Sequence, residues 1–133
     1  MDELYILTND GIVLFNHVYT EKVETQLFGA LLSAINSFSE EVSDGGLSNF
    51  ELSSRQFILF KKNDLLFIGS SSKKVKKEII SKQLEIIAEK FIEKYPILDK
   101  KGEWDSDITI FEPFEEDIKE IFEDSVQKFW KGF

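Results

Sequence analysis

Two apolar runs near the middle of the chain constrain its fold more than any other feature. Gln56–Lys61 and Leu65–Gly69 read QFILFK and LLFIG, and three polar residues separate them. β-Branched and aromatic residues favour strands, and a short polar linker between two such runs is typical of a hairpin. Because both runs are apolar almost throughout, both faces of this hairpin need cover. The chain must therefore supply further elements that pack over a sheet.

Three other stretches have the composition of strands. Leu4–Leu7 and Ile12–Tyr19 lie on either side of Asn9-Asp10-Gly11, whose residues tolerate the left-handed conformations of tight turns. Phe50–Arg55 is a weaker candidate, since its residues are less apolar. These stretches and the central hairpin predict five strands.

Helical periodicity accounts for most of the remaining chain. Val23–Val42 and Lys73–Tyr95 carry apolar residues at three- and four-residue spacing, and a third helix is expected from Pro113 onwards. Residues 97–112 lack a clear period, and we expect an irregular connection there with a short extended piece at Ile108–Phe111.

The order β-β-α-β-β-β-α-α predicts an α+β fold in αβα layers. A five-stranded, mostly antiparallel sheet with helices over its faces would use every element. The chain has 133 residues, 42% of them hydrophobic, with thirteen phenylalanines. That is enough for one domain, residues 1–133, to form a core without a metal or disulfide.

Composition excludes several classes of protein. With no cysteine, the chain has no disulfide framework, thiolate nucleophile or cysteine-based zinc site. No apolar stretch approaches the ~18 residues of a membrane span, and the acidic N-terminus does not begin a secretory signal. We therefore expect a cytoplasmic protein that reaches membranes at most peripherally, through its partners.

The charge is negative overall but unevenly distributed. A net charge of −9 argues against nucleic acid as a partner, because phosphates would be repelled. Residues 73–101 are the exception, with nine basic and five acidic side chains. The cluster Lys73, Lys74, Lys76 and Lys77 has two readings. It can serve solubility and pair with acidic residues of the same chain, or it can contact anionic lipid headgroups or an acidic partner.

The sequence offers no set of catalytic residues. His17 is the single histidine, so a catalytic triad or a two-histidine metal site cannot be built around it within one chain. No phosphate-binding glycine motif occurs, and Asp105-Ser106-Asp107 lacks the glycine and distal glutamate of a calcium loop. We predict no catalytic residue, cofactor or metal site, and no enzyme.

Val23–Val42 is unusual because its side opposite the apolar positions is uncharged. Small and polar residues occupy that side between Glu24 and Glu40, and we expect the sheet to cover the apolar side. The small side chains would then let a partner approach closely. This predicts a partner-binding surface of Phe28, Gly29, Leu32, Ser33, Asn36 and Ser37. The alternative is that another part of the chain, such as residues 97–112, covers this side.

Several strings resemble the longin, or SNARE-like, domain family. Leu4–Phe15 (LYILTNDGIVLF) resembles its first hairpin, and Asn49–Ile68 (NFELSSRQFILFKKNDLLFI) resembles its central strands. Phe111–Phe122 (FEPFEEDIKEIF) is similar to the last helix of small adaptor subunits and of the N-terminal domain of the signal recognition particle receptor alpha subunit. The chain begins with a strand, which favours longin over the related roadblock proteins, whose first element is usually a helix.

The resemblance implies a profilin/longin-like fold and a non-catalytic interaction module. Such domains commonly dimerise and engage small GTPases or vesicle-trafficking machinery, so a small GTPase, another longin or roadblock-type domain, or a second copy of the chain is the expected partner. No family binding residue has a matching motif in this sequence. A different class of function stays open, namely a sensor domain in which the phenylalanines line a pocket for a small molecule or lipid.

Overall fold

The structure is a computed structural model that describes residues 1–18, 25–42, 48–99 and 104–131, with the side chains of the last helix described as far as Phe122. Within these ranges it contains five strands, three α-helices and two short 3₁₀-helices. In chain order they are β1 (Glu3–Thr8), β2 (Val13–His17), α1 (Thr25–Val42), β3 (Asn49–Leu52), β4 (Arg55–Lys62), β5 (Leu65–Ser72), α2 (Lys77–Lys94), η1 (Pro96–Asp99), η2 (Ile108–Phe111) and α3 (Phe114–Lys131).

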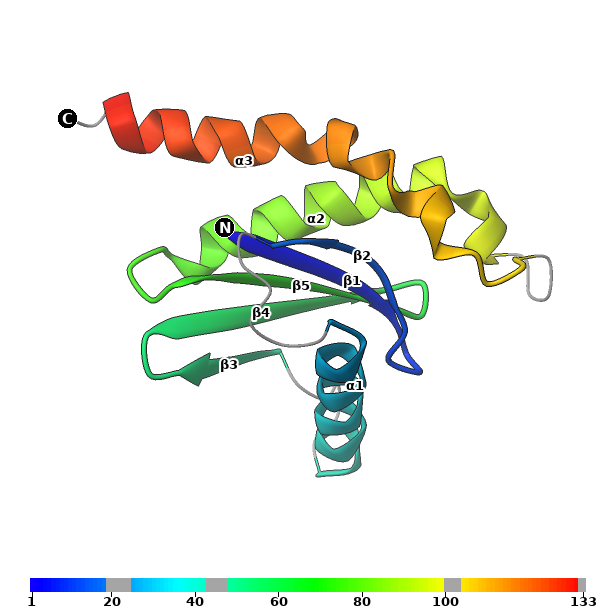
Figure 1. The fold of residues 1–133 in the computed structure, drawn as a ribbon. Helices are drawn as coiled ribbons and strands as arrows, with labels where there is room; N and C mark the ends of the chain where they lie inside the picture. The colour runs from blue at the N-terminus through cyan, green and yellow to red at the C-terminus, as the bar shows by residue number, and fades with distance from the viewer. Residues whose placement is uncertain (19–24, 43–47, 100–103, 132–133) are drawn as a thin grey trace.

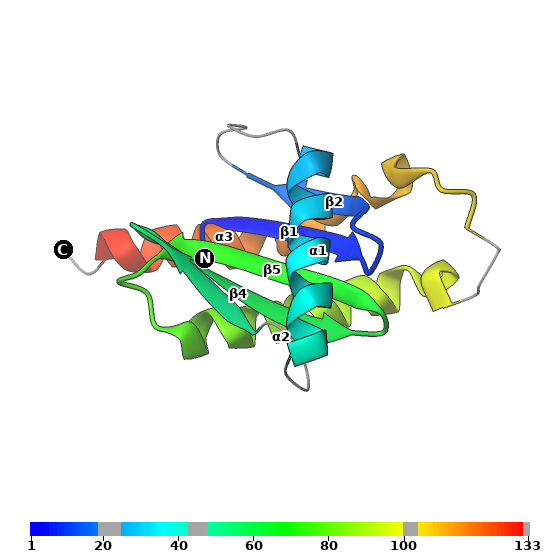
Figure 2. The ribbon, with the colours of Figure 1, turned by 90° about the horizontal axis from the view of Figure 1, so that it is seen from below.

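The five strands form one sheet in the order β2-β1-β5-β4-β3, and every pairing is antiparallel. The predicted central hairpin is β4 and β5, joined at Asn63 and Asp64, which both have positive φ. Of the described helices, α1 lies on one face of the sheet, while α2 and α3 cover the other face (Figures 1 and 2). The predicted α+β fold in αβα layers is therefore confirmed.

The larger core lies between the sheet and the two later helices. Phe91 of α2 is fully buried, and its ring contacts those of Phe67, Tyr95, Phe111 and Phe114 at centroid distances of 5.0 to 6.0 Å. Burying each large apolar side chain contributes ~1.5–3 kcal/mol. These phenylalanines are packed as core, and the alternative in which they line a ligand pocket stays a prediction.

The smaller core lies between the sheet and α1. Its buried members come from four strands and one helix: Leu7, Val13, Leu32, Phe57, Leu59, Leu66 and Ile68. Leu32 is the one member of this set that comes from α1. The helix therefore contributes little buried apolar surface to this core and covers the face incompletely. Figure 2 shows α1 crossing the strands nearer to the β1–β2 turn than to their other end, and no other described helix lies on this face.

Two predicted segments have different structures from those expected. Ile108–Phe111 is a 3₁₀-helix and not an extended piece, because the Asp107 carboxylate caps it by accepting hydrogen bonds from the backbone N–H and the hydroxyl of Thr109. The second helix begins at Lys77 and not at Lys73, because β5 continues to Ser72 and the backbone at Lys76 is still extended, with a φ of −67° and a ψ of 135°. Three of the four clustered lysines therefore precede the helix.

Candidate interaction surface

α1 packs on the sheet with the side that the sequence predicts to face outward. Leu32, Ser33 and Asn36 are only 1%, 8% and 6% exposed, whereas Leu27 and Phe38 are 66% and 67% exposed. The predicted orientation of this helix is therefore wrong. The reason lies in what the small residues contact.

Two glycines bring α1 against the β1–β2 turn. A Cβ atom on Gly29 would lie 2.5 Å from Cγ2 of Val13 and 2.7 Å from the carbonyl oxygen of Gly11. Gly11 itself has a φ of +89°, a conformation that L side chains rarely adopt, and a Cβ there would lie 3.0 Å from Cα of Ala30. The helix and the turn thus meet backbone to backbone, and only glycine fits at these two positions without a shift.

Polar side chains on the same side of α1 hydrogen-bond to the hairpin. The Ser33 hydroxyl donates to the carbonyl oxygen of Asn9, and the Gln26 side-chain amide donates to and accepts from the backbone of Val13. Farther along the helix, Glu40 accepts from the Asn36 amide at 3.2 Å and pairs with Lys61 of β4 at 3.5 Å. The uncharged side of α1 is therefore its docking side.

The six residues predicted to bind a partner divide accordingly. Gly29, Leu32, Ser33 and Asn36 are buried against the sheet and the turn, and Ser37 is exposed. Phe28 is half-buried, with its ring 4.9 Å from that of Tyr5 and 6.1 Å from that of Phe57. The alternative in which the chain covers this side itself is the one that the burial supports, although the cover is the β1–β2 hairpin and not residues 97–112.

The outward side of α1 carries a stripe of large apolar residues, which we call the outer stripe. All of its members are exposed, from 37% for Ile35 to 71% for Val42. The stripe consists of Leu27, Leu31, Ile35, Phe38 and Val42. Single exposed apolar residues are ordinary, but contiguous ones on the surface of one element mark interaction sites.

Aromatic contacts link α1 to the edge of the sheet. Phe28 contacts Phe57 of β4, and Phe57 stacks on Phe50 of the edge strand β3 at 4.6 Å with nearly parallel rings. Leu52, at the end of β3, is 57% exposed. The outer stripe, the aromatic rings and the β3 edge thus lie on the same side of the molecule.

Comparison with known proteins identifies the fold. No protein-family model and no curated protein matches the sequence. Among solved structures, MglB of Myxococcus xanthus has a TM-score of 0.59 at 9% identity, covering 76% of this chain and 81% of that one. A Roadblock/LC7 domain from Streptomyces avermitilis has a TM-score of 0.57 at 16% identity, covering 71% and 84%. The chain has the roadblock/longin fold.

A third likeness is weaker. It is to a chain of the signal recognition particle receptor SRb-GTP/SRX complex from Chaetomium thermophilum, with a TM-score of 0.42 at 22% identity and coverage of 77% and 80%. The predicted resemblance to the longin-like fold is confirmed by the two stronger matches. The preference for longin over roadblock stays a prediction, because identities of this size establish the fold alone.

The lysine cluster of this roadblock/longin fold is partly neutralised within the chain. Glu51 of β3 pairs with Lys73 at 3.2 Å and with Lys77 at 3.8 Å. Lys74 and Lys76 are exposed and form no ion pair with any residue that the structure describes. Internal pairing therefore accounts for two of the four lysines, and contact of the cluster with an anionic surface stays a prediction.

His17 holds α3 against the sheet. Its Nδ1 lies 2.5 Å from the Glu115 carboxylate, and its ring lies 4.1 Å from that of Phe122, so the imidazole contacts the helix at two points almost two turns apart. These contacts give the single histidine a structural role. In the described ranges no group of three histidine, aspartate or glutamate side chains could hold a metal ion, and no helix is long and apolar enough to cross a membrane.

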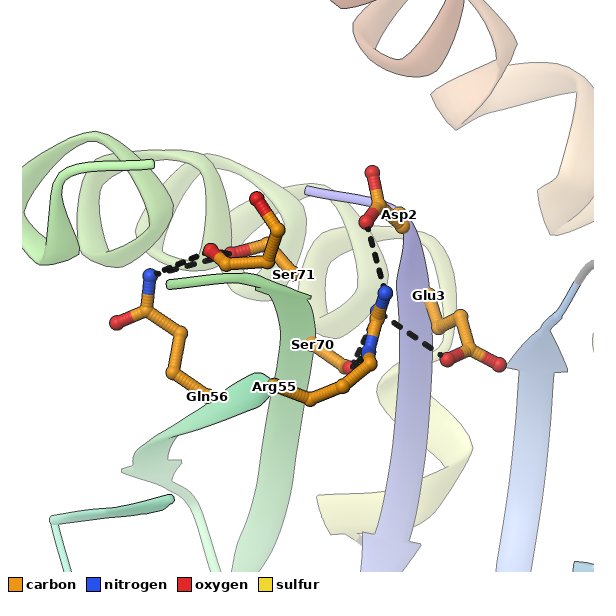
Figure 3. Close-up of polar contacts among 7 residues, drawn as sticks. Asp2, Glu3, Arg55, Gln56, Ser70 and Ser71 are labelled. Carbon is orange, nitrogen blue, oxygen red and sulfur yellow. Dashed lines mark hydrogen bonds and ion pairs between the residues drawn. The ribbon is translucent and has the colours of Figure 1, made fainter. Parts of the chain in front are cut away.

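A polar cluster at one end of the sheet has no signal in the sequence. Arg55 of β4 reaches across β5 to β1, donating to Asp2 at 3.2 Å, to Glu3 at 3.3 Å and to the buried hydroxyl of Ser70 at 2.7 Å (Figure 3). Beside it, the buried amide of Gln56 donates to Ser71 and to two backbone carbonyls. Each side-chain nitrogen of Arg55 and Gln56 has a partner, which indicates a structural cluster that ties the first strand to the central hairpin.

Proposed function

We propose that this chain is a non-catalytic interaction module that assembles through the outer stripe of α1 and the edge strand β3, and that the assembly is a platform for a small GTPase. The outer stripe carries the proposal. The chain buries the polar side of α1 and leaves five large apolar side chains in water, which costs free energy unless a partner covers them.

A second copy of the chain fits these surfaces. β3 pairs with β4 on one side only, and no other strand of the described sheet lies beyond it. Two β3 strands related by a twofold axis can pair antiparallel and extend the sheet across the interface. In the proposed dimer the same axis also brings the two outer stripes together, since α1 lies on the face of the sheet that Phe50 and Phe57 share. A related longin or roadblock-type domain could replace the second copy.

The family resemblance is the basis for proposing a small GTPase as the partner. The strings at Leu4–Phe15 and Asn49–Ile68 resemble longin domains, which commonly engage small GTPases and trafficking machinery. The roadblock/longin fold is consistent with this partner. Contact with membranes would then come through the partners, in the cytoplasm.

Solution mass tests the assembly. We expect the wild-type chain to have about twice the 15.4 kDa mass of one copy by light scattering at micromolar concentration. Leu31→Glu and Phe38→Glu should return the mass to one copy, because each would bury a carboxylate in the interface. Ile86→Glu, at a 48% exposed position of α2 on the opposite face, is the matched control and should leave the dimer intact. A wild-type mass of one copy at every concentration contradicts the homodimer.

Pull-down tests the GTPase. Immobilised chain would be presented with small GTPases loaded with GDP or with a non-hydrolysable GTP analogue. We expect retention of at least one GTPase in one nucleotide state, and less retention by Phe38→Glu if the platform must be dimeric. Equal background binding in both states for every GTPase would contradict this part of the proposal.

A further inference from the structure

Gln26 occupies the outer edge of β2. The backbone N–H of Val13 donates to Oε1 of Gln26 at 2.9 Å, and Nε2 of Gln26 donates to the carbonyl oxygen of Val13 at 3.1 Å. In an antiparallel strand, the N–H and C=O of one residue point to the same side. Both groups of Val13 therefore point away from β1, the neighbour of β2 in the sheet. The side-chain amide takes the place that a residue of another strand would take.

This arrangement makes the two edges of the sheet unequal. Open edge strands are templates for pairing with other chains, and natural sheets protect them with specific devices. At β2 the amide of Gln26 satisfies the Val13 pair, and η2 also lies against this strand. At β3 no described strand lies on the outer side. Among the described residues β3 has no such block, whereas Gln26 obstructs strand pairing at the Val13 end of β2.

The number of open edges decides which assembly can form. A sheet with two open edges can pair β2 of one copy with β3 of the next, and that heterologous contact repeats from copy to copy unless the rotation between copies closes a ring. A sheet with one open edge can pair only β3 with β3, and the assembly stops at two copies. Blocking β2 therefore removes the route to an open-ended assembly.

Gln26 also belongs to the helix that carries the interface. One side of α1 contacts the β1–β2 hairpin through Gln26, Gly29 and Ser33. Leu27, which follows Gln26 in the sequence, is 66% exposed and is the first residue of the outer stripe. The same docked helix thus closes one edge and presents the apolar surface beside the other.

We infer that Gln26 determines the specificity of assembly by capping the β2 edge at Val13, so that a partner strand pairs at β3 and not at β2. The inference rests on the proposed interaction function and adds the element that limits it to a closed dimer.

Two substitutions remove the edge contact in different ways. Gln26→Leu removes both hydrogen bonds, and Gln26→Glu keeps an acceptor for the Val13 N–H but loses the donor to its carbonyl. For both we expect sedimentation velocity to show concentration-dependent species larger than the dimer. Ser33→Ala is the control, because it removes another bond between α1 and the hairpin without exposing the β2 edge. It should stay dimeric.

Amide hydrogen exchange reports the contact directly. Exchange of the Val13 N–H should rise at least tenfold in Gln26→Leu and stay within about twofold of the wild type in Ser33→Ala. Far-ultraviolet circular dichroism would confirm that each variant is folded. If both Gln26 variants keep the wild-type mass, or if Val13 exchange is unchanged in Gln26→Leu, the inference is overturned.

The double variant Gln26→Leu with Phe38→Glu separates the inference from the proposed function. Phe38→Glu breaks the outer stripe, so larger species that persist in the double variant form through the β2 edge and support the inference. If the wild type is a monomer, the proposed homodimer fails, and the inference then requires that Gln26→Leu still gains larger species. The inference is overturned if Gln26→Leu and the double variant are both monomeric.

Discussion

At the scale of single residues, two glycines determine how α1 docks, because they have no side chain to hold the backbones apart. Gly29 and Gly11 let the backbone of α1 touch the β1–β2 turn, and this contact selects the polar side of the helix as the docking side. A longer side chain at either position would move the helix away from the hairpin. Gln26 and Ser33 could then no longer reach their backbone partners.

Gly29→Ala should therefore destabilise the fold, although alanine favours helices. The new Cβ would lie 2.7 Å from the carbonyl oxygen of Gly11, a backbone atom that cannot give way easily. We expect a loss of ~1–3 kcal/mol in the free energy of unfolding, measured by urea denaturation. Ser37→Ala, at an exposed position of the same helix, should change it by less than ~0.5 kcal/mol. A stabilised Gly29→Ala variant would contradict the close contact.

Replacing Tyr95 should raise the free energy of unfolding, in contrast to Gly29→Ala. Its hydroxyl is buried with no hydrogen-bond partner among the described residues, and burial raises the pKa of this phenol above its usual value of 10.0. Tyr95→Phe removes an unsatisfied polar group and should stabilise the chain by about 1 kcal/mol.

The pH dependence of Tyr95→Phe provides a second measurement. A raised pKa means that the folded state holds the proton more tightly than the unfolded state. The wild type should therefore lose stability from this group as the pH rises above 10.0, and the phenylalanine variant should not. Thermal melts between pH 7 and about 11 would show the two curves diverging. Parallel curves would contradict the assignment.

At the scale of elements, α1 shows that an amphipathic pattern does not reveal which side faces the core. The helix has two distinct sides, and the larger apolar set lies in water because a smaller set, Phe28 and Leu32, fills the space above the sheet. The polar residues beside them find hydrogen-bond partners in the hairpin. Packing of backbones, and not the amount of apolar surface, decides the orientation.

Adjacent leucines test this orientation. Leu32 is 1% exposed and Leu31 is 55% exposed, so they differ in environment while sharing a helix and a chemistry. Leu32→Ala should cost ~2–5 kcal/mol in the free energy of unfolding, whereas Leu31→Ala should cost less than about 1 kcal/mol in a dilute, monomeric sample. Denaturation of both variants under identical conditions is the measurement. The reverse ranking would show that the helix packs by its outer stripe.

At the scale of the whole molecule, the roadblock/longin fold separates two surfaces. α2 and α3 lie on one face of the sheet and α1 on the other (Figures 1 and 2). The first face holds the large aromatic core, and the second carries the outer stripe, the rings of Phe28, Phe50 and Phe57, and the edge strand β3. One face holds the larger core, and the other carries the surfaces proposed to assemble.

Salt should strengthen this assembly. Each copy carries a net charge of −9, so two copies repel each other, while the surfaces proposed to meet are mostly apolar. Raising the ionic strength from about 0.05 M to 0.5 M screens the repulsion, and the dimer dissociation constant should fall severalfold. Sedimentation equilibrium at the two salt concentrations measures this change. A dissociation constant that rises with salt would indicate an interface held by ion pairs.

The sequence by itself determined the elements and their order. The central hairpin, the first hairpin, the three helices and the antiparallel five-stranded sheet all follow from local periodicity and turn residues, since these act over a few neighbouring positions. The apolar composition of Ile108–Phe111 predicts an extended piece and not the observed 3₁₀-helix, because the cap comes from Asp107, which lies outside this segment. The tertiary structure alone decided which side of α1 faces the sheet and which edge is closed. Both depend on contacts between distant residues, Gly11 with Gly29 and Val13 with Gln26, and hydrophobic periodicity carries no information about such contacts.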